Sequence, residues 1–143
     1  MDVPTLKGVR AGPGRTLLVT WKNGAESPVD VEAHLDTFAV FAPLRADAHA
    51  FATVTVGEWG RNVHWTHDME IAADTLWRLA LEQGAAWLHA WRLGRVPRMT
   101  QHEAARALGV SVRMWRYYEG GTHLLPKTVR LAAIGLDHAA EAA

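Results

Sequence analysis

The side chains with the most evident binding chemistry lie close together in the last third of the chain. If residues 111–117 are helical, the outward positions are Ser111, Val112, Arg113, Arg116 and Tyr117. Arg113 is the best candidate to read a base, because a guanidinium can donate two hydrogen bonds to one guanine. Val112 could contact a thymine methyl group, while the serine, the tyrosine and the second arginine could bind phosphate or base. The chemistry indicated is recognition of nucleic acid.

Two consecutive helices are predicted to hold these side chains. Thr100 and Glu103 have the spacing of a capping box, in which each side chain binds the backbone N–H of the other residue. Gly109 should end this first helix, because glycine readily takes the left-handed conformation found there. Ser111 should cap the second helix. The turn between the helices is therefore short.

The apolar residues of this segment predict that the two helices pack on each other. Ala104, Ala105 and Leu108 should face inward from the first helix, and Trp115 and Tyr118 from the second. A small residue at position 105 allows the helices to cross closely, as a helix-turn-helix requires. We therefore expect the two aromatic residues to lie in the core and not to serve as stacking platforms for bases.

The segment from Thr100 to Gly120, together with Gly121, resembles the helix-turn-helix of the lambda-repressor/Cro family. It contains Gln-x-Glu-x-Ala from Gln101, then Leu-Gly-Val-Ser from Leu108, an aromatic residue, and Glu-x-Gly from Glu119. The resemblance covers about residues 85–136, and it implies a preceding helix near 87–93 and a closing helix from about residue 125.

This resemblance implies sequence-specific binding of double-stranded DNA in the major groove. It also implies that Gln101 holds a phosphate at a helix N-terminus, and Arg98 and Arg95, just upstream, could add positive charge. Members of the family usually act as symmetric dimers on palindromic operators, with half-sites about 34 Å apart. The implied function is a bacterial transcriptional regulator or an antitoxin-like autorepressor that acts as a homodimer.

Charge divides the chain into two halves. Residues 1–83 carry seven Lys/Arg against eleven Asp/Glu, whereas residues 84–143 carry eight against four, around a formal net charge of zero. The basic half is the one that can bind phosphate.

We predict an α+β fold class. A small antiparallel-sheet domain of unknown function (1–83) should precede an all-α, lambda-repressor-like helix-turn-helix domain (84–143).

The first half reads as short strands separated by turns. The sequence predicts a hairpin in which Asn23 and Gly24 both take positive φ between the strands Thr16–Trp21 and Glu26–Val31. A short helix at Pro43–Phe51 and further strands at 52–56 and 62–65 follow. The pattern then becomes helical from Asp74, with an end or interruption expected at Gly84. Trp59 and Trp65 are expected to cover the sheet.

Residues 14–77 resemble a small bacterial domain of unknown function that is often encoded near toxin–antitoxin pairs. The resemblance rests on Arg15-Thr-Leu-Leu-Val-Thr-Trp-Lys-Asn-Gly, on Phe41-Ala-Pro-Leu-Arg and on Asp74-Thr-Leu-Trp. It implies dimerisation, binding of a protein partner or binding of a small ligand. An alternative function is therefore a protein-binding adaptor or toxin-neutralising protein whose helical half mediates protein contacts.

Little in the sequence points to catalysis. His64, His67 and Asp68 resemble a metal-ligand set and leave a metal-dependent enzyme as a third alternative, but on a strand the two histidines would point to opposite faces. We therefore expect no metal site, no cofactor and no enzymatic activity. The chain has no cysteine, no signal-peptide pattern and no apolar run of membrane-spanning length, so a cytoplasmic location is expected.

Overall fold

The computed structural model describes residues 3–66 and 68–142, which fall into two compact units with the boundary between Ala80 and Leu81. The first unit contains two small antiparallel sheets and several short helices, and the second is helical. The predicted α+β fold class is thus confirmed at this level. Helix α4 (Ala73–Leu93) begins in the first unit and ends in the second.

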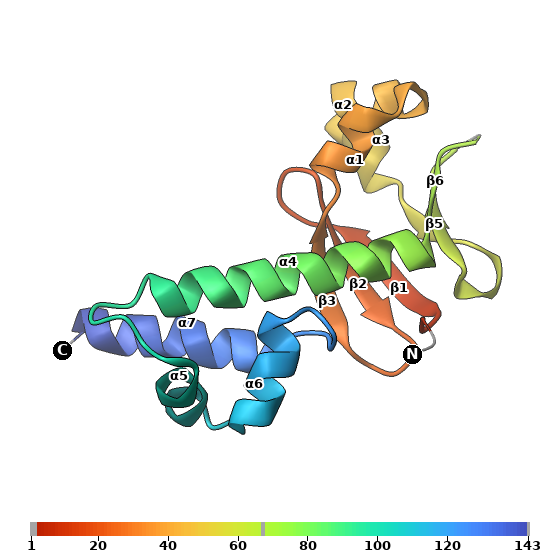
Figure 1. The fold of residues 1–143 in the computed structure, drawn as a ribbon. Helices are drawn as coiled ribbons and strands as arrows, with labels where there is room; N and C mark the ends of the chain where they lie inside the picture. The colour runs from red at the N-terminus through yellow and green to blue at the C-terminus, as the bar shows by residue number, and fades with distance from the viewer. Residues whose placement is uncertain (1–2, 67, 143) are drawn as a thin grey trace. The chain divides into compact units, whose positions relative to one another are not determined.

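Three strands form the main sheet of the first unit (Figure 1). They are β1 (Leu6–Ala11), β2 (Thr16–Trp21) and β3 (Glu26–Asp30), paired antiparallel in sequence order. Every second residue of β2 is buried, as the alternation of side chains along a strand requires. The predicted strands at 16–21 and 26–31 are therefore present, and β1 is an addition that the sequence reading did not contain.

The turn between β2 and β3 differs from the predicted two-residue hairpin. Gly24 has φ +92°, but Asn23 is not among the described residues with positive φ. The N–H of Gly24 donates to Trp21 O at 2.9 Å, and the N–H of Ala25 donates to the Asn23 side chain at 2.9 Å. The side-chain hydrogen bond stabilises a longer turn in which the glycine alone takes the left-handed conformation.

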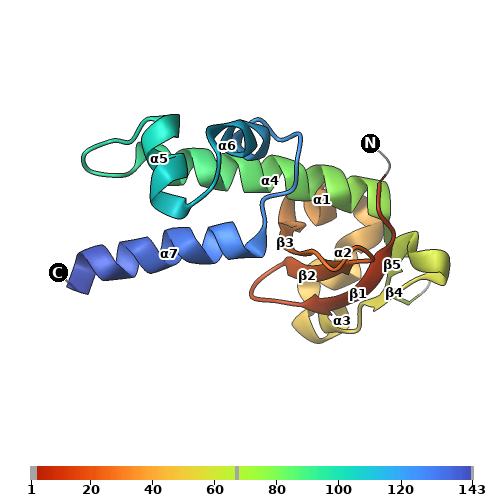
Figure 2. The same ribbon diagram turned by 90° about the horizontal axis from the view of Figure 1, so that it is seen from below.

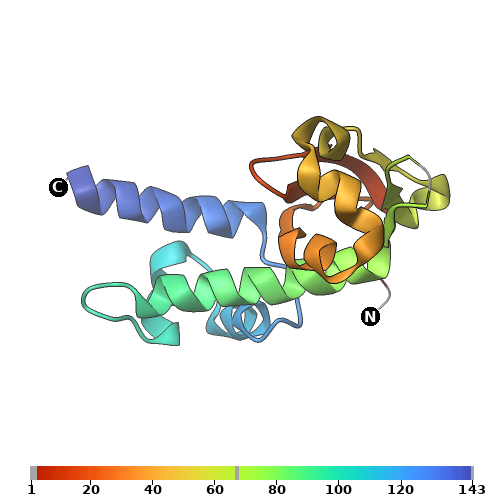
Figure 3. The ribbon, with the colours of Figure 1, turned by 90° about the horizontal axis from the view of Figure 1, so that it is seen from above.

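Short helices connect the main sheet to the second one, and Figure 3 shows α1 to α3 grouped together. Asp47 separates α2 from α3, because its side chain accepts the N–H of His49 and caps a new helix. The single helix predicted at Pro43–Phe51 was therefore wrong. The elements of this region are α1 (Glu32–Thr37), η1 (Ala39–Phe41), α2 (Ala42–Ala46), α3 (Ala48–Ala52), β4 (Thr55–Val56), η2 (Glu58–Gly60), β5 (Asn62–His64) and β6 (Glu70–Ala72).

Aromatic side chains fill the core of the first unit. The ring of Trp21 meets that of Trp77 edge-on, with 5.0 Å between centroids. Trp65 stacks on Phe51 at 5.8 Å, and its indole N–H donates to the carbonyl of the same residue at 2.8 Å. Trp65 is buried, as expected for a core residue, but the contacts of its ring are with Phe51 of α3 and Phe41 of η1.

Trp59 does not cover the sheet, contrary to the prediction. Its side chain is 81% exposed, and its backbone has φ +60°. Gly60 has no room for a side chain, because a Cβ there would lie 2.4 Å from the carbonyl oxygen of Leu6. The close backbone approach of Gly60 to Leu6 fixes the turn, and it holds Trp59 in a left-handed conformation that is rare for a bulky residue.

Four helices build the second unit: the end of α4, α5 (Gln101–Leu108), α6 (Val112–Glu119) and α7 (Lys127–Ala142). Figure 2 shows α5 and α6 against the part of α4 that belongs to this unit. The buried cluster between the helices is Leu88, Ala104, Ala105, Trp115, Tyr118, Leu125 and Val129. Within the described part of the chain, no helix is long and apolar enough to cross a membrane.

Helix α4 runs through Gly84 without interruption, so the expected helix end at this residue was wrong. Gly84 is buried, and a Cβ there would lie 3.1 Å from the Cβ of Leu125. The glycine therefore serves a close approach between α4 and the chain before α7 and does not end the helix.

Candidate nucleic-acid interface

Local side-chain contacts begin both helices of the α5–α6 pair. Thr100 Oγ1 accepts the N–H of Glu103 at 3.1 Å, and the Glu103 carboxylate accepts the N–H of Thr100 at 3.0 Å. The hydrogen bonds from Thr100 lower the pKa of Glu103. Gly109 ends α5 with φ +73°, and Ser111 caps α6 by accepting the N–H of Met114 at 3.1 Å. The predicted capping box and both caps are confirmed.

The inward residues of the pair are also as predicted. Ala104, Ala105 and Trp115 are each at most 2% exposed, and Tyr118 is buried beside them. Burial raises the pKa of the Tyr118 phenol. These aromatic rings are core residues, so the face of α6 that remains available for binding is the opposite one.

A carboxylate at the end of α6 organises the polar side of this core. Glu119 accepts hydrogen bonds from Arg92, at 2.6 Å from its Nη2, and from the indole of Trp115, and His89 Nδ1 lies 2.6 Å from its Oε1. Burial alone would raise the pKa of Glu119, but the hydrogen bonds from Arg92, His89 and Trp115 lower it to about 2. The charge on Glu119 therefore ties α4 to α6.

Gln101 joins the start of α5 to the outer face of α6. Its amide nitrogen donates to Glu119 Oε2 at 3.4 Å, and its amide oxygen accepts from Arg116 Nε at 3.4 Å. The guanidinium of Arg116 is otherwise exposed. The structure thus brings the predicted phosphate ligand of α5 next to a predicted DNA contact of α6.

The other outward positions of α6 are less uniform than the sequence suggests. Arg113 is exposed, whereas Val112 is half-buried against the core cluster. The oxygen of Ser111 is already the acceptor of the helix cap, although its O–H remains a donor. Arg113 is therefore the outward residue with the most accessible polar atoms at the start of the helix.

Arg113 contacts Tyr117 one turn later on α6. Its Nε donates to Tyr117 Oη at 2.9 Å, and its Cζ lies 5.6 Å from the centre of the tyrosine ring. The hydrogen bond raises the pKa of the guanidinium. The ring of Tyr117 also stacks on that of His123, with 4.5 Å between centroids and 15° between planes.

The two arginines before α5 have different surroundings. Arg98 is exposed, and within the described residues no hydrogen bond or ion pair holds its side chain. Arg95 forms an ion pair with Asp137, and its guanidinium lies 5.1 Å from the ring centre of Trp91. Arg98 is therefore free to add positive charge near α5, whereas Arg95 links α4 to α7.

The histidine set considered as a metal site lies partly outside the described residues, because His67 is not among them. His64 is exposed, and its Nε2 lies 3.1 Å from Thr55 Oγ1. In residues 3–66 and 68–142, no three potential metal ligands come together.

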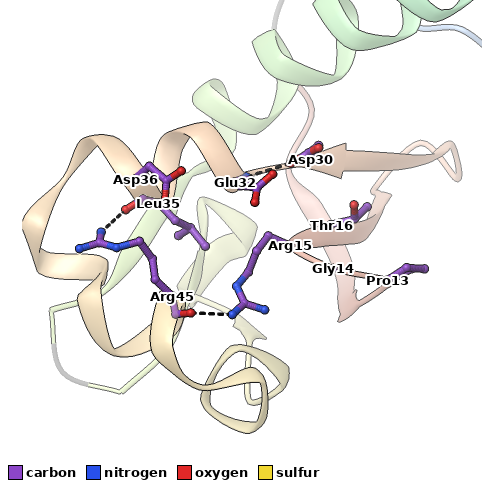
Figure 4. Close-up of a pocket in the computed structure, with 9 residues that line it drawn as sticks. All are labelled: Pro13, Gly14, Arg15, Thr16, Asp30, Glu32, Leu35, Asp36 and Arg45. Atoms are coloured by element: carbon purple, nitrogen blue, oxygen red, sulfur yellow. Dashed lines mark hydrogen bonds between the residues drawn. The ribbon is translucent and has the colours of Figure 1, made fainter.

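The first unit contains a cavity of about 490 Å³ between β2, β3 and the short helices. Arg15 and Arg45 lie in its wall, with Asp30, Glu32 and Asp36 around them (Figure 4). Arg15 Nη2 donates to the carbonyl oxygen of Arg45 at 2.8 Å, and Arg45 Nη1 donates to backbone carbonyls of the α1 region. Arg15 thus ties the turn before β2 to α2, and Arg45 ties α2 to α1 and the residue that follows it.

Three residues around α6 in the second unit were not predicted from the sequence: His89, Arg92 and His123. His89 and Arg92 share a face of α4 three residues apart, a spacing that could have drawn attention to them. The partner carboxylate, Glu119, lies far along the chain, and no local pattern predicts that contact. The stacking of His123 on Tyr117 depends on the turn after α6 and has no signal in the sequence either.

Comparisons with known proteins place both units in context. Residues 6–82 match the family "Protein of unknown function (DUF2442)", which agrees with the resemblance seen at 14–77 and extends it. A crystal structure from Nitrosomonas europaea, described as that of a candidate DNA-binding protein, is 33% identical with a TM-score of 0.52. The match covers 96% of this chain and 90% of that one. No curated protein matches. The chain therefore belongs to the DUF2442 family.

Proposed function

We propose that the second unit binds double-stranded DNA through α6. The observation that carries this proposal is the exposed pair of arginines on α6, Arg113 and Arg116, set on a helix whose opposite face is fixed by buried Trp115. A rigid helix with two outward guanidinium groups fits the major groove, which admits an α-helix and displays guanine acceptors. In this arrangement, α5 and α6 act as a helix-turn-helix similar to that of the lambda-repressor/Cro family.

The start of α5 would bind the phosphate backbone beside the groove. The first backbone N–H groups of a helix attract anions, and Gln101 lies there next to Arg116. Arg98, which is exposed just before the helix, adds a positive charge. Ser111 and Tyr117 can add hydroxyl contacts and Val112 an apolar one. These contacts would set the orientation of α6 on the duplex.

The distribution of charge and the relative from Nitrosomonas europaea support the same proposal. The excess of basic residues lies in 84–143, the predicted DNA-binding domain. The relative is described as a candidate DNA-binding protein and is similar over nearly the whole chain. We propose a cytoplasmic transcriptional regulator or antitoxin-like autorepressor, without enzymatic activity or cofactor, that acts as a homodimer on a palindromic operator.

Fluorescence anisotropy with the duplex upstream of the protein's own gene tests this proposal. We expect affinity to fall steeply with salt, because bound phosphates release counterions. Arg113→Ala should weaken binding by about 1–3 kcal/mol and relax the preference at one base pair. Arg116→Ala should weaken binding to all duplexes alike. Absence of binding at low salt, or unchanged binding by Arg113→Ala, would refute the proposal.

A second candidate function, binding of a protein partner by the first unit, is favoured by Trp59. This residue is 81% exposed on a turn that Gly60 holds against β1, and tryptophan is enriched among the hot spots of protein interfaces. Stoichiometric co-purification of a protein with the wild type, and its loss with Trp59→Ala, would support an adaptor or toxin-neutralising role. Retention of that protein by Trp59→Ala would exclude this surface.

A further inference from the structure

A connected row of three side chains runs from the start of α6 to the turn that follows it: Arg113, Tyr117 and His123. Tyr117 accepts the Nε–H of Arg113 at 2.9 Å and stacks on His123, with 4.5 Å between ring centroids. Thr122 fixes the turn beneath this row, since its Oγ1 donates to the carbonyl of Tyr117 at 3.2 Å and lies 3.1 Å from Nδ1 of His123. Arg113 therefore contacts Tyr117 from the preceding turn of α6, and Thr122 and His123 contact it from the turn that follows the helix.

These contacts leave a defined part of Arg113 for a ligand. The hydrogen bond uses Nε, and no contact within the described residues uses Nη1 or Nη2. The two terminal nitrogens of a guanidinium form a planar fork that matches a pair of acceptors. In the major groove, O6 and N7 of guanine provide such a pair. An arginine ordered before binding also loses less conformational entropy when it meets its ligand.

We propose that Tyr117 is a positioning residue for guanine recognition: it holds Arg113 by Nε so that Nη1 and Nη2 meet O6 and N7 of one guanine. His123 and Thr122 keep the tyrosine in place. This inference rests on the proposed function and adds the base that α6 reads and the device that orients the reader. It also changes the role of Tyr117 from a direct DNA contact to a support for one.

The test compares a selected duplex with a copy in which the recognised guanine is 7-deazaguanine, which lacks the N7 acceptor. For the wild type, we expect the modified base to weaken binding about tenfold, within the range for a bidentate contact. Tyr117→Phe keeps the ring and removes the hydrogen-bond acceptor, so its penalty should fall to about threefold or less. Arg113→Ala should show no penalty for the modified base.

Arg116→Ala is the matched control, because it removes an arginine from the same helix face that does not contact Tyr117. The Arg116→Ala variant should bind DNA more weakly overall and keep the wild type's penalty of about tenfold for 7-deazaguanine. In the DNA-free protein, the Nε–H resonance of Arg113 should shift and exchange faster in Tyr117→Phe, while the resonance of Arg116 stays unchanged.

The outcomes separate this inference from the proposed function. A full 7-deazaguanine penalty in Tyr117→Phe, or an unchanged Arg113 resonance in that variant, would overturn the positioning role and leave DNA binding intact. Failure of the wild type to bind any duplex at low salt would overturn the proposed function, and guanine recognition with it.

Discussion

The indole N–H groups of the most buried tryptophans donate to different kinds of acceptor in the two units. In the first unit, the indole of Trp21 donates to the neutral hydroxyl of Ser27 at 3.1 Å. In the second, the indole of Trp115 donates to the carboxylate of Glu119, which Arg92 also holds. Both tryptophans are fully buried, so the difference lies in the acceptor and not in the packing.

A second pair of tryptophans repeats this contrast. Trp65 donates to the backbone carbonyl of Phe51, whereas Trp91 donates to the carboxylate of Asp137, at 3.1 Å from its Oδ2. Asp137 is itself paired with Arg95. These tryptophans of the first unit thus donate to neutral acceptors, and those of the second to carboxylates. The stability of the second unit should therefore respond to acid and to loss of a carboxylate far more than that of the first.

Removal of the central carboxylate should give the largest effect. Glu119→Gln leaves the charge of Arg92 without its partner inside the helical unit, which should cost about 3–5 kcal/mol. Ser27→Ala, the matched change in the first unit, should cost about 1 kcal/mol, because it removes one neutral acceptor. Hydrogen exchange followed by mass spectrometry reports each unit separately. Equal losses of protection in the two variants would break the contrast.

Acid should destabilise the second unit through the same residue. Glu119 has a pKa of about 2 in the folded unit against an ordinary value of 4.5. A lowered carboxyl pKa stabilises the fold fully above pH 4.5, and this contribution is lost as the pH falls towards 2. We expect a loss of about 3 kcal/mol over this window.

Thermal unfolding followed by circular dichroism between pH 6 and 2 measures this loss. Glu119→Gln is the control, because it cannot titrate at this position, and its melting temperature should change less over the window. An identical acid response of wild type and Glu119→Gln would show that Glu119 does not carry the pH dependence.

Loss of a helix cap should cost about the same stability in each unit. Thr100→Ala removes the cap of α5, and Asp47→Ala removes that of α3, each of which accepts a backbone N–H. Each substitution should cost about 1 kcal/mol. Local hydrogen exchange of the two helices checks this expectation, and a much larger loss in one unit would mean that caps, and not only tryptophan acceptors, separate the units.

The smallest expected effect is a gain of stability in the first unit. Trp59→Asn places a residue that tolerates positive φ where tryptophan is strained, and little buried surface is lost from an 81% exposed side chain. The unit should gain about 0.5–1 kcal/mol. Urea unfolding measures the change, and a loss of stability would show that the ring of Trp59 packs more than its exposure indicates.

Local signals in the sequence predicted the helix pair well. The caps at Thr100 and Ser111 and the glycine at 109 act through neighbouring backbone groups, so residue types at fixed spacing were enough. Trp115 and Tyr118 follow from helical periodicity. The predicted boundary at 83/84 remains a prediction, since the compact units meet within α4, between Ala80 and Leu81.

Features that depend on the three-dimensional surroundings of a residue could not be predicted from local patterns in the sequence. Gly84 looks like a helix end until Leu125 is seen against it. Trp59 has the apolar type of a core residue, but the structure leaves it 81% exposed, on a turn with φ +60°. The bond between Arg113 and Tyr117 has the ordinary spacing of an intrahelical pair, but His123 joins them only through the turn after α6.

Selection from random duplex DNA by the wild type and by Arg113→Ala tests the central claim most directly, because it needs no knowledge of the operator. The proposed function predicts an inverted repeat with half-sites about 34 Å apart and a guanine at the same position of each, with loss of preference at that position for Arg113→Ala. No enriched sequence for the wild type at low salt, or the same site for both proteins, would contradict it.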